Sequence, residues 1–160
     1  MSTAGMQVPE ANNFMAVEAD LVALLQAAVK DLRPKVHVLT AAQLTNVTQT
    51  RQTTPALHVV YGGPMRVAEN QGTRLLLEHI WHVVVVVSHM GSVRTGEHAR
   101  AEVGPLVARV MSALAGAKIR RAIAPLELAD PPRPWFEAGT QFFPISVRVQ
   151  TVFHKLPLPN

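Results

Sequence analysis

The stretch Glu137 to Phe153, EAGTQFFPISVRVQTVF, decides the fold class. From Phe143 onward apolar and polar residues alternate with a period of two, which is typical of a long β-strand with one buried face. The residues expected on the buried face are Phe143, Ile145, Val147, Val149, Thr151 and Phe153, with Ser146, Arg148 and Gln150 on the other.

A second strand is predicted from Glu78 to Ser88, EHIWHVVVVVS. Its five consecutive valines favour a strand over a helix because β-branched side chains pack well on a pleated surface. Apolar residues on both faces predict a central strand covered on both sides. We expect Val83, Val85 and Val87 to be buried on one face and Val84 and Val86 on the other, with Trp81 in the core.

Two helices complete the pattern. Apolar residues at helical spacing predict one helix from about Ala16 to Leu32 and another from Gly96 to about Leu114. Pro105 should kink the second helix or mark its first turn, and Gly116 is suited to its C-terminal cap. Shorter predicted elements are a strand at Lys35 to Leu39, a capping box from Thr40 to Gln43, a strand at Ala56 to Tyr61, a hairpin across Asn70-Gln71-Gly72 and an edge strand at Ala122 to Leu128.

These elements predict a single α+β domain in which two main helices pack against a mostly antiparallel or mixed β-sheet. We expect residues 1–15 to be a flexible N-terminal arm, residues 16–154 the domain, and residues 155–160 a C-terminal tail. Thr45 to Pro55 and Ser88 to Thr95 are polar and should be exposed loops that become ordered against partners.

Composition excludes several classes of protein. Among the 160 residues, 48% are hydrophobic and 16% charged, which argues against disorder, and there is no cysteine for a disulfide or a cysteine-ligated zinc site. The valine run is far too short for a membrane span. The net charge is +4, and its densest basic group, Lys118, Arg120 and Arg121, is expected to be a solvated helix end rather than a nucleic-acid site.

No catalytic, cofactor-binding or metal-binding residues are predicted. His79 and His82 lie three apart on a strand, so their rings point to opposite faces and do not chelate one ion. No serine lies in a GxSxG turn, and no phosphate-binding loop follows Gly62-Gly63. Trp135 and Phe136 follow a proline cluster, and we expect them to be exposed and available for an interface.

Several segments, taken in their order along the chain, resemble those of a known protein family. The first two are the opening amphipathic helix and the polar loop with Arg51 ahead of Pro55-Ala56-Leu57. The others are Tyr61-Gly62-Gly63, Asn70-Gln71-Gly72-Thr73-Arg74 leading into Trp81-His82-Val83-Val84-Val85, Ala101-Glu102-Val103-Gly104-Pro105-Leu106, and the close from Phe136 to Phe153. In this order, from about Val17 to Phe153, the chain resembles the tail terminator (tail-completion) proteins of Mu-like tailed bacteriophages.

The resemblance implies a non-enzymatic virion protein that works without a cofactor. Such a protein forms a hexameric ring on the head-proximal end of the tail, where it stops polymerisation of the tube and contacts the neck. In a contractile tail it also contacts the sheath protein, and DNA passes through its lumen without sequence-specific binding. The implied location is the virion, after assembly in the host cytoplasm, with no membrane partner. As candidate interface residues we take Arg51, Trp135 and Phe136.

Two other functions stay open at this point. One is another virion part, such as a head–tail connector or a baseplate adaptor. The other is a small nucleic-acid-binding protein, which would show salt-dependent affinity for DNA.

Overall fold

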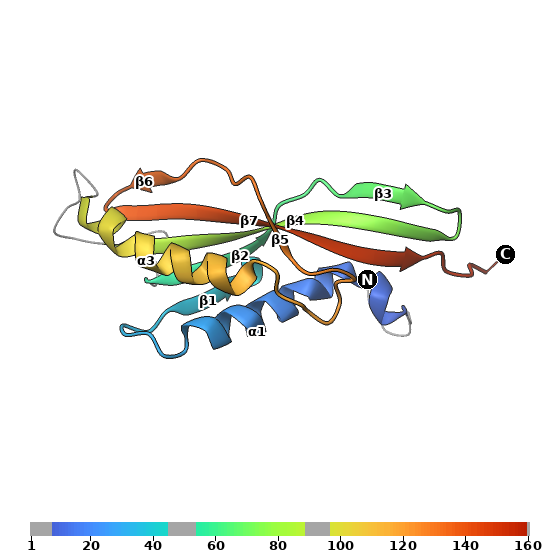
Figure 1. Cartoon of the computed structure of the whole chain (residues 1–160), viewed down its shortest axis with the longest axis horizontal. Helices are drawn as coiled ribbons and strands as arrows, with labels where there is room; N and C mark the ends of the chain where they lie inside the picture. Colours follow the sequence, from blue (N-terminus) through green and yellow to red (C-terminus); the bar gives the residue numbers. More distant parts are fainter. Residues whose placement is uncertain (1–7, 45–53, 89–96, 160) are drawn as a thin grey trace.

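The computed structural model describes residues 8–44, 54–88 and 97–159. It shows a single α+β domain with one mixed seven-stranded sheet and two main helices, so the predicted fold class is confirmed (Figure 1). The predicted loops at 45–55 and 88–95 lie mostly outside the described residues.

Two strands of 15 residues each, β4 (Arg74–Ser88) and β7 (Thr140–His154), form the centre of the sheet. They pair antiparallel along their whole length, from Arg74 opposite His154 to Ser88 opposite Thr140. The predicted strands at 78–88 and 143–153 are therefore both present, and each is a few residues longer than its apolar pattern.

The shorter strands line the two outer edges of this pair. On the β4 side, β2 (Ala56–Tyr61) and β3 (Arg66–Asn70) pair with successive parts of β4, and β1 (His37–Thr40) runs parallel to β2. On the β7 side, β5 (Glu127–Ala129) and β6 (Trp135–Glu137) pair with successive parts of β7. The strand predicted at 122–128 overlaps β5 only at Glu127 and Leu128, because Pro125 donates no ladder hydrogen bond, but β5 lies at the edge of the sheet as expected.

The β3–β4 hairpin has the turn that its sequence predicts. Gly72 has a φ of +77°, and the Gln71 N–H donates to the Arg74 carbonyl over 2.9 Å. The Gly72 N–H donates to Oδ1 of Asn70 over 3.1 Å, so the asparagine side chain closes the turn locally.

The helices are α1 (Val17–Val29), the single-turn α2 (Ala41–Leu44) and α3 (Glu97–Leu114). Pro105 lies inside α3 rather than at its start, and Gly116 follows the helix with a φ of +73°, as expected of a C-terminal cap. One of the two hydrogen bonds of the predicted capping box is present before α2, since the Thr40 N–H donates to Oε1 of Gln43 over 2.8 Å.

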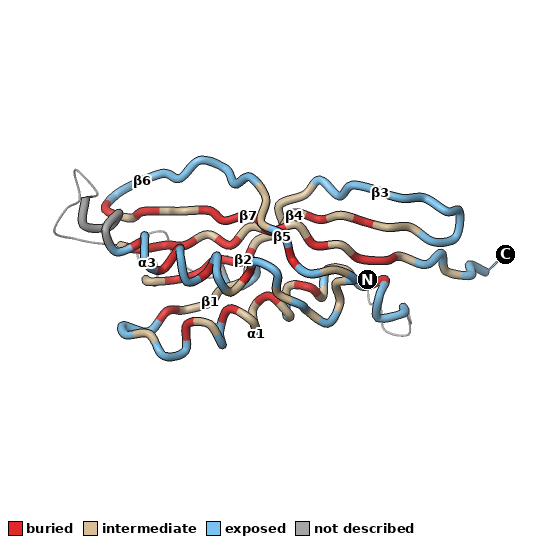
Figure 2. The backbone as a smooth tube through the Cα atoms, in the orientation of Figure 1, coloured by how far each residue is buried: buried red, intermediate tan, exposed pale blue. Residues whose placement is uncertain are grey.

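Both main helices pack on the same face of the sheet, so the expectation of a central strand covered on both sides is wrong (Figures 1 and 2). The core face carries Trp81, Val83, Val85 and Val87 of β4, which pack with apolar residues of α1, α3 and β7. On the opposite face Val84 is only half-buried. Val86 is nevertheless fully buried, because it lies between Ala56 of β2 and Phe142 of β7 in the sheet.

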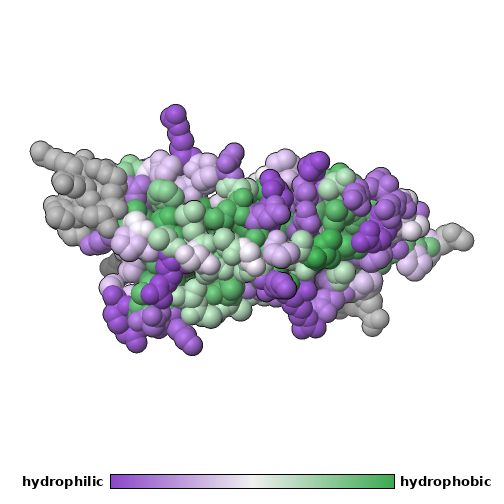
Figure 3. Space-filling model, viewed as in Figure 1, coloured by the Kyte–Doolittle hydropathy of each residue, from purple (hydrophilic) through white to green (hydrophobic). Residues whose placement is uncertain are grey.

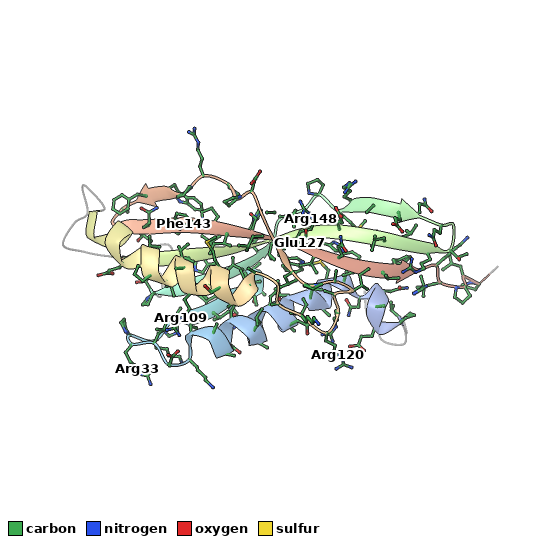
Figure 4. All side chains as sticks on the ribbon, in the orientation of Figure 1. Arg33, Arg109, Arg120, Glu127, Phe143 and Arg148 are labelled. Atoms are coloured by element: carbon green, nitrogen blue, oxygen red, sulfur yellow. The ribbon has the colours of Figure 1, made fainter. Side chains whose placement is uncertain are left out.

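The basic group after α3 does not end a helix. Arg121 pairs with Asp20 of α1 over 2.7 Å, and Arg120 pairs with Glu10 near the N-terminus over 2.9 Å (Arg120 is labelled in Figure 4). Arg120 and Arg121 therefore tie the α3–β5 connection to the N-terminal part of the chain.

Val85 tests the assignment of the core face, because its side chain is fully buried between β2 and β7. Val85→Asp buries an unpaired carboxylate and should lower the free energy of unfolding by several kcal/mol, about 3 or more, or abolish soluble expression. Val67→Asp is the matched control, because Val67 is 47% exposed on β3. Chemical denaturation measures both, and equal midpoints would contradict the assignment.

Candidate interaction surfaces

The β6–β7 hairpin carries an exposed aromatic pair. Trp135 of β6 lies opposite Phe142 of β7, and their rings stack with centroids 4.8 Å apart and planes within 5° of parallel. The Trp135 side chain is still 44% exposed. Nε2 of Gln141 donates to the carbonyls of Trp135 (3.0 Å) and Phe142 (3.3 Å), which fixes the backbone behind the pair.

The turn of this hairpin explains why so short a strand forms. Ala138 and Gly139 occupy the two central positions with φ values of +49° and +81°, the combination that two-residue hairpin turns of the primed type require. The sequence prediction missed β6 because three prolines precede it and only three residues pair.

The three candidate interface residues fall in different environments. Trp135 is exposed as expected, whereas Phe136 is half-buried, because it alternates to the other face of β6, opposite the buried Gln141. Arg51 lies outside the described residues. An interface role for these residues stays a prediction.

The half of the β4–β7 pair beyond the helices is covered by the N-terminal segment. Residues 10–12 and 14–16 form two short 3-10 turns that lie against it (Figure 1). The buried side chain of Asn12 donates to the His154 carbonyl (2.7 Å) and accepts from the His154 N–H (2.8 Å), so it replaces a strand partner at the end of β7. The flexible arm was predicted for residues 1–15: residues 10–16 make the contacts described here, whereas residues 1–7 lie outside the described residues and the arm stays a prediction.

Asn12→Ala removes both hydrogen bonds at the end of β7. Because backbone groups of His154 lose their partner, we expect the free energy of unfolding to fall by about 1–3 kcal/mol. Asn13→Ala is the control, since Asn13 is exposed and its side chain makes no capping bond. Equal thermal midpoints for the two variants would show that Asn12 does not hold the segment in place.

His79 lies under this N-terminal segment, fully buried on the core face. Its two ring nitrogens bond the Tyr61 hydroxyl (3.1 Å) and Oγ1 of Thr151 (2.9 Å), and Phe14 stacks on the ring at 4.6 Å. Burial lowers the pKa of His79, so the neutral form is favoured.

The opposite face of the sheet holds two further histidines. Nδ1 of His82 bonds the Ser146 hydroxyl over 2.7 Å, and a side chain at Gly62 would collide with the His82 ring. Burial lowers the pKa of both His58 and His82. The prediction that His79 and His82 point to opposite faces is confirmed.

The three lowered histidine pKa values predict acid sensitivity. The unfolded chain takes up protons below a pH of about 6.5 while the folded histidines resist them, so stability is complete above that pH and falls below it. Between pH 7 and pH 5 the free energy of unfolding should fall less for His79→Gln than for the wild type. The difference between the two falls should be at most about 1.4 kcal/mol per pH unit, the limit for one titrating group. Urea titrations at both pH values measure this, and identical pH slopes would contradict it.

Two apolar surfaces are open to solvent. One is a groove of about 640 Å³ between the end of α1, the start of β2, the end of β4 and α3, with Leu32, Val36, Val87 and Leu106 among its apolar lining and Arg33 and Arg109 among its polar lining (both arginines are labelled in Figure 4). The other lies on the half of the sheet beyond the helices, where Met15, Met65 and Val67 are exposed. Figure 3 shows apolar residues gathered on that half of the visible face, bordered by hydrophilic ones.

Among the residues that the structure describes, no group of three or more histidine, cysteine, aspartate or glutamate side chains is placed to hold a metal ion. Within the same residues, no helix has both the length and the apolar character needed to cross a membrane. The features available for function are surfaces for binding a partner, namely exposed aromatic residues, strand edges and apolar areas.

Comparison with known proteins identifies the family. Residues 10–155 match the sequence profile of the family described as Phage tail terminator protein. The chain belongs to this family. Membership makes it a structural protein of the phage tail and indicates a non-enzymatic role, as the sequence resemblance implied.

Individual known proteins show little similarity to this chain. No curated protein sequence matches the chain. A solved structure described as the virion of a native gene transfer agent (GTA) particle contains a chain with 21% identity and a TM-score of 0.45, covering 94% of this chain and 99% of that one. At that identity and score the likeness supports no functional inference.

Proposed function

We propose that this protein forms a ring on the head-proximal end of the phage tail tube, stops tube polymerisation there and joins the tail to the neck. The observation that carries the proposal is the family match over residues 10–155, which includes every main element of the fold. The family favours this function over a head–tail connector, a baseplate adaptor or a nucleic-acid-binding protein.

A closed ring is suited to stopping polymerisation of the tail tube. A terminator must match the tube end on one side and offer no copy of that end on the other. A closed ring of heterologous contacts does this, because the lateral surfaces are used up between neighbours and no filament grows. We propose six subunits, in keeping with the hexamer that the resemblance implies.

The molecule offers suitable lateral surfaces for such a ring. The outer edge of β1 at one side of the sheet and the outer edges of β5 and β6 at the other have no strand partner in the described structure. Trp135 adds exposed apolar area beside β6. We propose that the lateral contacts use these edges and Trp135, with Phe136 and Arg51 as further interface residues.

The remaining partners follow from the proposed position. The ring would contact the tube protein on one side and a neck or connector protein on the other, and the sheath protein as well in a contractile tail. DNA would pass through the lumen without sequence-specific contacts. Assembly would take place in the host cytoplasm, and the ring would remain in the virion.

Deletion of the gene tests this function. Phage lacking the protein should make tails of abnormal length that fail to join heads, and wild-type protein supplied in trans should restore both. Cryo-electron microscopy of complemented particles should show one ring between tube and neck. Tails of normal length that join heads without the protein, or density only at the distal end, would contradict the proposal.

A further inference from the structure

The C-terminal segment after β7 is rich in leucine and proline and is exposed except at the half-buried Leu156. Lys155 donates its N–H to the Thr73 carbonyl over 2.7 Å, and Leu158 beyond it is 76% exposed, the highest value among the large exposed apolar side chains described. Pro157 and Pro159 have fixed φ angles and hold the preceding Leu156 and Leu158 in extended or polyproline II conformations. Such a segment loses little conformational entropy when it binds.

In the polyproline II conformation, the helical period decides which side chains of the segment lie together. With three residues per turn, Lys155 and Leu158 lie on the same side, about 9 Å apart along the axis. In this conformation the segment presents one cation and one exposed leucine toward the same partner surface.

The β6–β7 hairpin offers a surface of matching chemistry. Trp135 and Glu137 are two residues apart on β6, so both side chains point to one face, about 7 Å apart along the strand. Trp135 is exposed and backed by Phe142, while Glu137 is exposed and has no ion-pair partner among the residues described. An indole ring beside a carboxylate suits a proline-rich segment that carries a lysine, because prolines and leucines pack on the ring and the charges pair.

The hairpin that the segment fits cannot be its own. Thr140 and His154 lie at opposite ends of the 15-residue strand β7, roughly 46 Å apart at the rise of an extended strand. The five residues after His154 reach at most about 18 Å. Figure 1 shows β6 and the C-terminus at opposite ends of the elongated molecule.

We propose that residues Lys155–Pro159 of one copy dock on the β6–β7 hairpin of a second copy, with Leu158 and its flanking prolines on Trp135 and Lys155 paired with Glu137. This inference rests on the ring proposed above and names one of its contacts. The contact joins two different patches, as a heterologous ring requires, and each copy carries both. Because one contact is small, it is weak alone and gains strength when the ring closes.

A synthetic peptide of residues 153–160 tests the docking on the full-length protein by NMR. The chain has two tryptophans, so the buried Trp81 is an internal control. The peptide should shift the indole signal of Trp135 in a saturable way and leave that of Trp81 unchanged. Trp135→Ala should weaken binding about ten-fold or more, as expected of an interface aromatic residue.

A charge exchange tests the orientation. The Lys155→Glu peptide should bind the wild-type protein about two- to five-fold more weakly, the effect of one exposed ion pair, and should recover affinity for the Glu137→Lys protein. Peptide binding that is unaffected by Trp135→Ala, or a Glu137→Lys protein that prefers the wild-type peptide, would overturn the proposal.

The absence of cysteine from the chain permits disulfide trapping between whole subunits. Glu137→Cys mixed with Lys155→Cys should give a covalent dimer, both at high protein concentration and in assembled tails. The control replaces Glu137→Cys by Glu69→Cys, which is also an exposed carboxylate position, on β3. Equal yields with Glu69→Cys, or no cross-link in either setting, would overturn the docking.

The docking and the capping function fail differently. A ring seen on tails whose subunits do not cross-link leaves the capping function intact and overturns only the docking. An absent ring overturns the capping function, whatever the peptide and the cross-linking show.

Discussion

The antiparallel ladder between β4 and β7 is the constraint on which the rest of the structure depends. Fifteen residues of each strand pair without interruption, so the ladder sets the length of the molecule and the distance between its two ends. Every other strand except β1 pairs directly with one of these two strands. Ile145, Val147 and Val149 of β7 lie on the same face as the buried valines of β4, and this apolar strip is what α1 and α3 cover.

The β4–β7 ladder extends beyond the helices that cover it. The N-terminal segment covers this remaining part of the ladder, largely through polar contacts. Beyond the helices, the core face carries His79 and Thr151 in place of further valines, and Phe14 closes over the imidazole. Asn12 supplies the hydrogen bonds that a neighbouring strand would otherwise make to His154. Ion pairs from Glu10 to Arg120 and Arg121 complete the attachment, so the N-terminal segment is part of the domain from residue 10 onward.

Much of the fold could be predicted because its main elements have local patterns. The valine run, the alternation after Phe143 and the helical spacing before Pro34 each specify an element within a few residues. The missed features depend on distant residues: the Asn12–His154 pair spans 142 positions, and β6 depends on a positive φ at Ala138 and on the Trp135–Phe142 stack. The sequence did not predict that both helices lie on one face of the sheet. A run of valines has the same pattern whether a helix or neighbouring strands bury the second face of its strand. The exposure of Trp135 could be predicted from its proline-rich context, whereas strand alternation leaves Phe136 half-buried.

The ladder also bears on how a terminator ring would keep its dimensions while its sequence varies. Backbone hydrogen bonds, not particular side chains, hold the hairpin end and the C-terminal end of each subunit at a fixed separation. Near the middle of the sheet Arg148 of β7 pairs with Glu127 of β5 over 3.1 Å, in an exposed ion pair of the kind that contributes little to stability (Figure 4). In the proposed docking, the separation between the C-terminal segment and the hairpin of one subunit would therefore follow from strand length, whereas partner specificity would reside in the few exposed side chains at the two ends. Substitution at those ends would change which subunits join without changing that separation.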